Sequence, residues 1–66
     1  MTNCLKVERA RRNLTQQDVA QAVGVSRQTI LAIESRKYVP SAVLALKLAA
    51  FLAMPVETLF ALEPGE

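Results

Sequence analysis

The feature that most constrains this chain is residues 15–34, TQQDVAQAVGVSRQTILAIE, where two short helical patterns follow each other almost directly. Thr15 is a helix-capping residue type, and Asp18 follows it at the spacing of a capping box. Gly24 is typical of a helix end, because glycine adopts the left-handed conformation at least steric cost. Ser26 then provides a second cap. We therefore predict a helix of about two turns, a connection of about three or four residues and a second helix.

Apolar residues recur at helical spacing on both sides of the predicted turn. Val19, Ala20 and Val23 form one inward stripe, and Ile30 and Ile33 form the next. Two helices with this separation are typical of a helix-turn-helix, in which the second helix lies in the major groove of DNA. The alternative is a helical bundle with polar outer faces and no affinity for DNA, because a fold alone does not determine function.

The residues expected on the outer side of the motif are polar and gather at the two helix starts. They are Gln16 and Gln17 on one first turn, and Ser26, Arg27, Gln28 and Thr29 on the other. Helix starts carry free backbone N–H groups and a positive dipole end, both of which favour phosphate. Arg27 can pair with guanine and Gln28 with adenine through paired hydrogen bonds. On a basic chain, this pattern favours DNA binding over the plain bundle.

The run LTQQDVAQAVGVSRQTILAIESRKYVPS resembles the Cro/phage-repressor (XRE-type) helix-turn-helix family, in particular its small single-domain bacterial regulators. The resemblance continues through ALKLAAFLAMPVETLF and covers residues 4–62. Its most specific part is SRQTI, followed by AIE and then by K-Y-x-P-S. It implies a five-helix, all-α Cro/repressor-like domain that binds DNA. It also implies that residues 1–4 can pair as a strand with the C-terminal tail.

The resemblance further implies an ion pair between Arg9 and Glu34. Arg9 lies in the first expected helix, residues 5–12, and Glu34 ends the second helix of the motif. A partly buried pair at these positions would tie the first helix to the third, and would determine geometry more than stability. The alternative is a solvated arginine that contributes less than about 1 kcal/mol.

Two further positions on the second motif helix concern base reading. Leu31 follows the inward Ile30, so we expect it to face outward. It can touch a thymine methyl group, or else pack at the edge of the groove or against Tyr38. Related sequences often carry a longer base-reading side chain where this chain has Ala32, which leaves base reading to fewer residues.

The loop after the motif contains two adjacent bases and a phenol. We expect Arg36 and Lys37 to clamp phosphate, and Tyr38 to point its hydroxyl group at phosphate. Such contacts position a protein on the duplex without reading its sequence. The alternative is an ordinary solvated loop.

The last third of the chain predicts two helices and a tail. Ser41 is a helix start signal before the apolar residues of 41–52, and Pro55 begins a short last helix over 56–60. Alternating residues indicate a short strand at 60–63. Because four helices already enclose a core this small, we expect uncovered apolar side chains at this end. A two-fold dimer would cover them, through Met54, Val56, Leu59, Phe60 and Leu62.

Composition excludes several classes of function. The chain has 66 residues, one cysteine and no histidine, which excludes an intramolecular disulfide and a Cys/His zinc site. We expect no metal, cofactor or small-molecule ligand, and the absence of an activated nucleophile or paired carboxylates argues against an enzyme. No signal peptide is expected, because the N-terminal run MTNCLKVERARR lacks an apolar core region. No membrane span is expected either, because Lys47 and Pro55 interrupt the longest apolar run. This predicts a cytoplasmic protein with Cys4 reduced.

The charge is distributed unevenly along the chain. All eight basic residues lie within 1–47, whereas residues 48–66 contain three acids and no base. A basic front and an acidic back suit a protein that turns one side to phosphate. We predict a single domain over 1–66, with the helix-turn-helix at about 15–34 and dimerisation through 55–66.

The resulting hypothesis is a homodimeric, sequence-specific transcriptional regulator that binds a palindromic operator on double-stranded DNA, with repression as the default outcome. The alternative is a protein-interaction module, such as the antitoxin component of a toxin–antitoxin pair. In that case the apolar excess at Val43, Ala50 and Phe51 would be the partner site.

Overall fold

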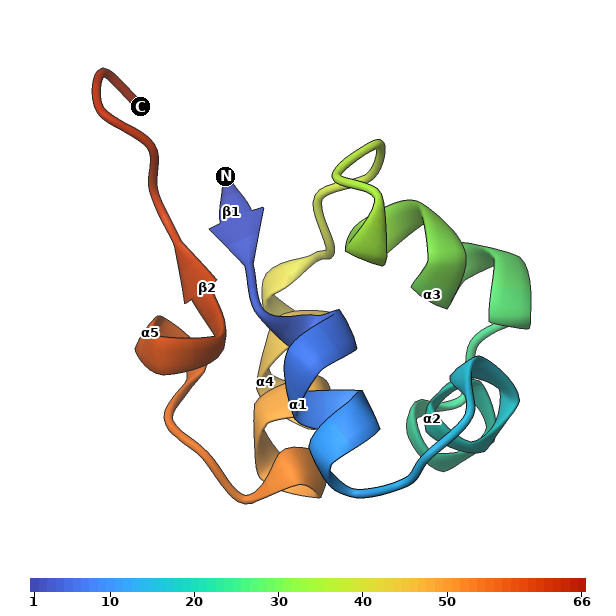
Figure 1. Cartoon of the computed structure of the whole chain (residues 1–66). Helices are drawn as coiled ribbons and strands as arrows, with labels where there is room; N and C mark the ends of the chain where they lie inside the picture. The colour runs from blue at the N-terminus through green and yellow to red at the C-terminus, as the bar shows by residue number, and fades with distance from the viewer.

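Five short helices connect two terminal strands in the computed structural model, which describes all of residues 1–66 (Figure 1). This is the fold class that the sequence predicted. In chain order the elements are β1 (Thr2–Asn3), α1 (Leu5–Arg11), α2 (Gln16–Val23), α3 (Arg27–Glu34), α4 (Ala42–Leu52), α5 (Val56–Leu59) and β2 (Phe60–Ala61).

Side chains that cap backbone N–H groups determine where the central helices begin. Thr15 Oγ1 accepts from the Asp18 N–H at 3.0 Å, and the Asp18 carboxylate accepts from the Thr15 N–H at 2.8 Å, which completes the predicted capping box. Ser26 caps α3 and Ser41 caps α4 in the same way. Helix α2 ends at Gly24 with a φ of 77°, so the turn between α2 and α3 has the expected left-handed residue.

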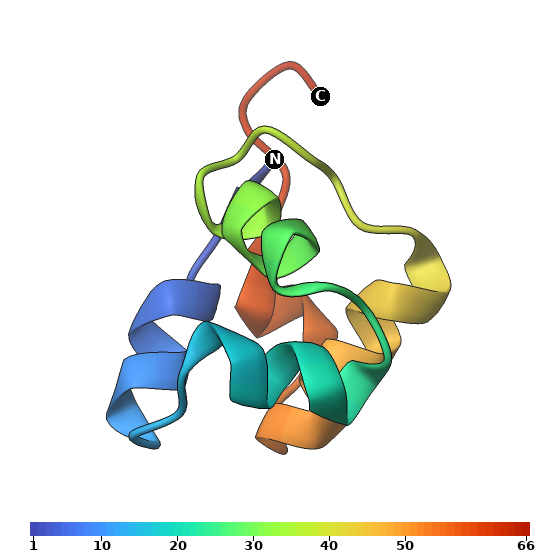
Figure 2. The same ribbon diagram turned by 90° about the vertical axis from the view of Figure 1, so that its right-hand side faces the viewer.

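The core is a single cluster to which all five helices contribute. Figure 2 shows α3 lying across α2, and the side chains between the helices are buried. A fully buried aliphatic side chain contributes about 1.5–3 kcal/mol, so this cluster holds α2 and α3 in place. Its members are Leu5, Val19, Ala20, Val23, Ile30, Ile33, Leu44, Leu48, Ala49, Leu52, Leu59 and Phe60.

The prediction that four helices close this core is wrong. Leu59 is 1% exposed and Phe60 is 7% exposed, so both belong to the protein's own interior. Each contributes more to stability when buried here than when exposed at the surface. Two of the five apolar residues that were expected at a dimer surface are therefore buried within the protein itself.

The terminal strands bring the two ends of the chain together. β1 and β2 pair antiparallel, with Thr2 opposite Ala61 and Asn3 opposite Phe60. The Asn3 side chain then reaches further, because its Nδ2 donates to the Ile33 carbonyl oxygen at 2.9 Å. The sheet thus contacts the C-terminal turn of α3. No helix combines the length and the apolar character needed to cross a membrane.

Candidate nucleic-acid interface

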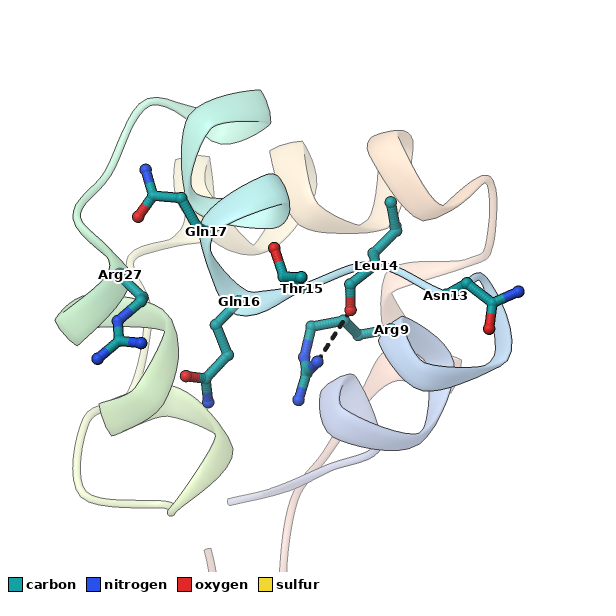
Figure 3. A pocket seen from close by; sticks show the side chains of 7 residues that line it. All are labelled: Arg9, Asn13, Leu14, Thr15, Gln16, Gln17 and Arg27. Atoms are coloured by element: carbon teal, nitrogen blue, oxygen red, sulfur yellow. Dashed lines mark hydrogen bonds between the residues drawn. The ribbon is translucent and has the colours of Figure 1, made fainter.

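A polar hollow lies beside the start of α2, and α1, the turn after α1 and Arg27 at the start of α3 complete its lining. Its volume is about 410 Å³, and only one of its lining residues is hydrophobic. Figure 3 shows Arg27 from α3 on the side of Gln16 and Gln17 of α2, with Thr15 and Arg9 on the opposite side of Gln16. Two helix N-termini, each with free N–H groups, therefore border the same polar surface. Such a surface suits an anion such as phosphate.

Arg27 and Gln28 are the side chains best placed to contact a partner. Both are exposed on the first turn of α3, and neither takes part in a hydrogen bond or an ion pair within the protein. Because the backbone of this turn is held by the Ser26 cap, the two side chains project from a rigid base. They combine a guanidinium and a carboxamide, the groups that bind guanine and adenine edges.

Ser26 and Thr29 are engaged locally. Ser26 Oγ accepts from the Thr29 N–H at 3.2 Å and lies 3.0 Å from Thr29 Oγ1. Their hydroxyl groups therefore hold the first turn of α3 together. This placement differs from that of Arg27 and Gln28, although all four were predicted to contact DNA.

Glu34 is the centre of a network that joins three helices. Arg9 Nε donates to Glu34 Oε2 at 2.7 Å, and Arg9 Nη2 donates to Glu34 Oε1 at 3.2 Å. This is the ion pair that the family resemblance implied. The Arg9 side chain is 16% exposed and that of Glu34 only 5%. The hydrogen bond to Glu34 raises the pKa of Arg9, whereas burial acts in the opposite direction.

Gln16 belongs to the same network. Its Nε2 donates to Glu34 Oε1 at 3.1 Å, and the side chain is half-buried. The amide group of Gln16 therefore links the start of α2 to the end of α3, while its carbonyl oxygen makes no contact within the protein. Gln17, the other predicted glutamine, is exposed and has no internal partner.

Of the two cations in the loop after α3, Arg36 forms an ion pair and Lys37 does not. Arg36 has a left-handed backbone, with a φ of 64°, and its Nη2 donates to Glu63 Oε1 of the C-terminal tail at 2.9 Å. Lys37 makes no ion pair. Tyr38 is 46% exposed, and its backbone N–H donates to the Ala32 carbonyl oxygen at 3.2 Å. The tail contact of Arg36 was not foreseen, because a separation of 27 residues leaves no local signal.

The predicted dimer residues have unequal exposure. Leu62 is 70% exposed, and Met54 and Val56 are half-buried against the core. Leu59 and Phe60 lie beneath them in the interior. Other apolar side chains are exposed on α4, including Val43 at 64%.

Known proteins resemble this chain over most of its length. A helix-turn-helix family model matches residues 5–59. An uncharacterized HTH-type transcriptional regulator of Methanocaldococcus jannaschii, MJ0272, is 53% identical over 66 residues, which is the whole of both chains. The corresponding regulator YgzD of Bacillus subtilis is 46% identical over 63 residues, or 96% of each chain.

A solved structure agrees with these relatives. The restriction-modification controller protein C.AhdI from Aeromonas hydrophila superposes with a TM-score of 0.79 and 30% identity over 85% of each chain. The two relatives named above are both HTH-type transcriptional regulators. This chain, with its capped α2, its Gly24 turn and its exposed α3 start, belongs to the XRE/Cro-type helix-turn-helix family of DNA-binding transcriptional regulators.

Proposed function

We propose that this regulator binds an inverted-repeat operator as a homodimer and represses transcription from it. The observation that carries the proposal is the exposed, unpartnered Arg27 and Gln28 pair on the rigid first turn of α3. One such helix turn reaches only a few base pairs. Two copies related by a two-fold axis would read two half-sites about 34–36 Å apart on the same side of the duplex.

The site residues divide into base-reading and backbone-contacting groups. Arg27 and Gln28 read base edges, and Thr29 lies at the edge of the same surface. Phosphate contacts hold the register. They come from Gln17, the N-terminus of α2, the second N–H of the Gln16 carboxamide, Ser26, Arg36, Lys37 and the Tyr38 hydroxyl.

The second copy packs against the C-terminal segment, residues 55–66, and the turn before it. Leu62 offers the most exposed apolar side chain there, flanked by the half-buried Met54 and Val56. Leu59 and Phe60 support this surface from below. Repression then requires only that the dimer occupy DNA that a polymerase needs.

The experiment is selection of bound DNA from a random pool, followed by gel-shift titration on the selected sequence. We expect an inverted repeat. Arg27→Ala and Gln28→Ala should each weaken operator binding by about 1–3 kcal/mol and relax the preference at one position. Lys47→Ala, an exposed lysine on α4, is the charge-matched control and should leave binding unchanged. Equal losses on operator and random DNA for Arg27→Ala would contradict base reading.

A second candidate is a protein-interaction module of the antitoxin kind. The exposed apolar side chains on and before α4 favour it, since Val39, Val43 and Leu46 are 60%, 64% and 58% exposed. Sedimentation of the purified protein separates the two. A stable dimer that binds its operator without a co-purifying protein supports the repressor, whereas a stoichiometric partner that Val43→Asp releases supports the module.

A further inference from the structure

A second hollow lies on α3, beside the base-reading pair. Its volume is about 330 Å³, and its lining residues are Ser26, Gln28, Thr29, Ala32 and Tyr38. Ala32 and Thr29 are three positions apart on the helix and so share a face. The hollow exists because alanine is short at a position that projects beside Gln28.

Two of the five lining residues are hydrophobic, and we refer to the apolar part of the lining as the floor. The Thr29 hydroxyl group is hydrogen-bonded to Ser26 at 3.0 Å, and its methyl group is the apolar part that Thr29 can offer a ligand. Ala32 contributes a second methyl group. Tyr38 closes the hollow with its ring, and its place is secured because the N–H groups of Lys37 and Tyr38 donate to the Ala32 carbonyl oxygen at 2.9 and 3.2 Å.

The polar groups stand at the rim. The Gln28 carboxamide has no partner within the protein, so its NH₂ group is free to donate beside the apolar floor. An occupant that fits both parts needs a small apolar group next to a hydrogen-bond acceptor. In the major groove, thymine alone presents a methyl group next to an acceptor oxygen, O4.

We propose that this hollow accepts the C5-methyl group of a thymine, and that Ala32 and Tyr38 determine specificity at that position. The proposal rests on the DNA-reading function proposed above. Cytosine would bind less tightly there, because it lacks the methyl group. Leu31, the other residue considered for a thymine contact, is 48% exposed and does not line this hollow.

The test is to replace each thymine of the selected operator by deoxyuridine, which removes only the methyl group. At one thymine per half-site we expect affinity to fall about fourfold, the effect of burying one methyl group. Ala32→Leu fills the hollow, so the ratio of thymine to uracil affinity should return to about one at that position. Tyr38→Ala removes the exposed wall without altering the helix and should also lower the ratio. Leu31→Ala is the matched control and should leave the ratio at about four.

The outcomes separate this inference from the function on which it depends. A protein that binds no DNA at low salt overturns both. Tight operator binding with a ratio of one at every thymine overturns only the inference. A ratio that survives in Ala32→Leu and Tyr38→Ala but vanishes in Leu31→Ala also overturns it, and assigns the thymine contact to Leu31.

Discussion

Two arginine–glutamate pairs flank α3, and they differ in burial rather than in length. Arg9 lies 2.7 Å from Glu34, and Arg36 lies 2.9 Å from Glu63. The first pair is 16% and 5% exposed, whereas the second is 52% and 45% exposed. Water screens the second pair and leaves the first nearly unscreened. Although the two distances are nearly equal, the Arg9–Glu34 pair is therefore a structural anchor and the Arg36–Glu63 pair is a weak surface contact.

The two pairs also differ in what else their arginines could bind. Arg9 is held by Glu34 and by the Leu14 carbonyl oxygen, so its guanidinium is already engaged within the protein. Arg36 is in a loop that we propose contacts phosphate, and Glu63 occupies the same guanidinium. The buried pair joins α1 to α3, and the exposed pair would compete with the phosphate contact that we propose for Arg36.

The largest expected effect is on the buried pair. Glu34→Ala should lower the free energy of unfolding by about 3–5 kcal/mol, because Arg9 would keep its charge in a partly buried site without a charged partner. Urea denaturation measures this loss. The double variant Arg9→Met with Glu34→Leu should recover most of it, since an apolar pair of similar volume avoids desolvation of charge. A loss below about 1 kcal/mol in Glu34→Ala would show that this pair contributes no more to stability than an exposed ion pair does.

The next largest effect concerns the salt dependence of DNA binding, in which we expect Lys37 and Arg36 to differ. Lys37 has no internal partner, so Lys37→Ala should weaken binding to operator and random DNA alike and reduce the slope of log affinity against log salt by about one. Arg36→Ala should reduce it by less, because Arg36 must first leave Glu63. Gel shifts over a salt series measure both slopes, with Lys47→Ala as the control. A steeper loss from Arg36→Ala would show that Glu63 does not compete.

A smaller effect is expected when the competitor itself is removed. Glu63→Gln should raise affinity for any DNA about 1.4- to fivefold, because an exposed ion pair contributes about 0.2–1 kcal/mol. Glu57→Gln, an exposed acid on α5 without an ion pair, removes the same charge and serves as the control. Equal gains from the two substitutions would indicate a general charge effect instead of competition for Arg36.

The smallest effect concerns the exposed capping box in acid. The Thr15 backbone N–H and hydroxyl group lower the pKa of Asp18 below its ordinary value. The folded protein thus binds fewer protons here than the unfolded chain does. The stabilisation is present above the ordinary value, about 3.9, and is lost as the pH falls through the lowered pKa. In thermal melts, the wild type should therefore have a higher melting temperature than Asp18→Asn at neutral pH, and the two should melt at the same temperature in strong acid.

Most of the helices could be predicted from residues that interact over short distances in the sequence. The Thr15 cap, the Gly24 turn and the Ser26 and Ser41 caps act through hydrogen bonds and backbone preferences within a few residues of each other. Such interactions depend little on the rest of the fold, which is why the elements begin and end near their predicted residues. The exposed Arg27 and Gln28 follow from the same pattern, because their place on the first turn of α3 depends only on where that helix begins.

The family resemblance implied that the two ends of the chain pair, but only the tertiary structure decided which other residues they contact. Asn3 contacts the Ile33 carbonyl oxygen, and Glu63 contacts Arg36, across separations of 30 and 27 residues. Leu59 and Phe60 were expected at a dimer surface and lie in the core. No local pattern distinguishes an apolar side chain that closes its own core from one that meets a partner. That choice depends on how much space the other helices leave unfilled, and it is determined only when they have packed.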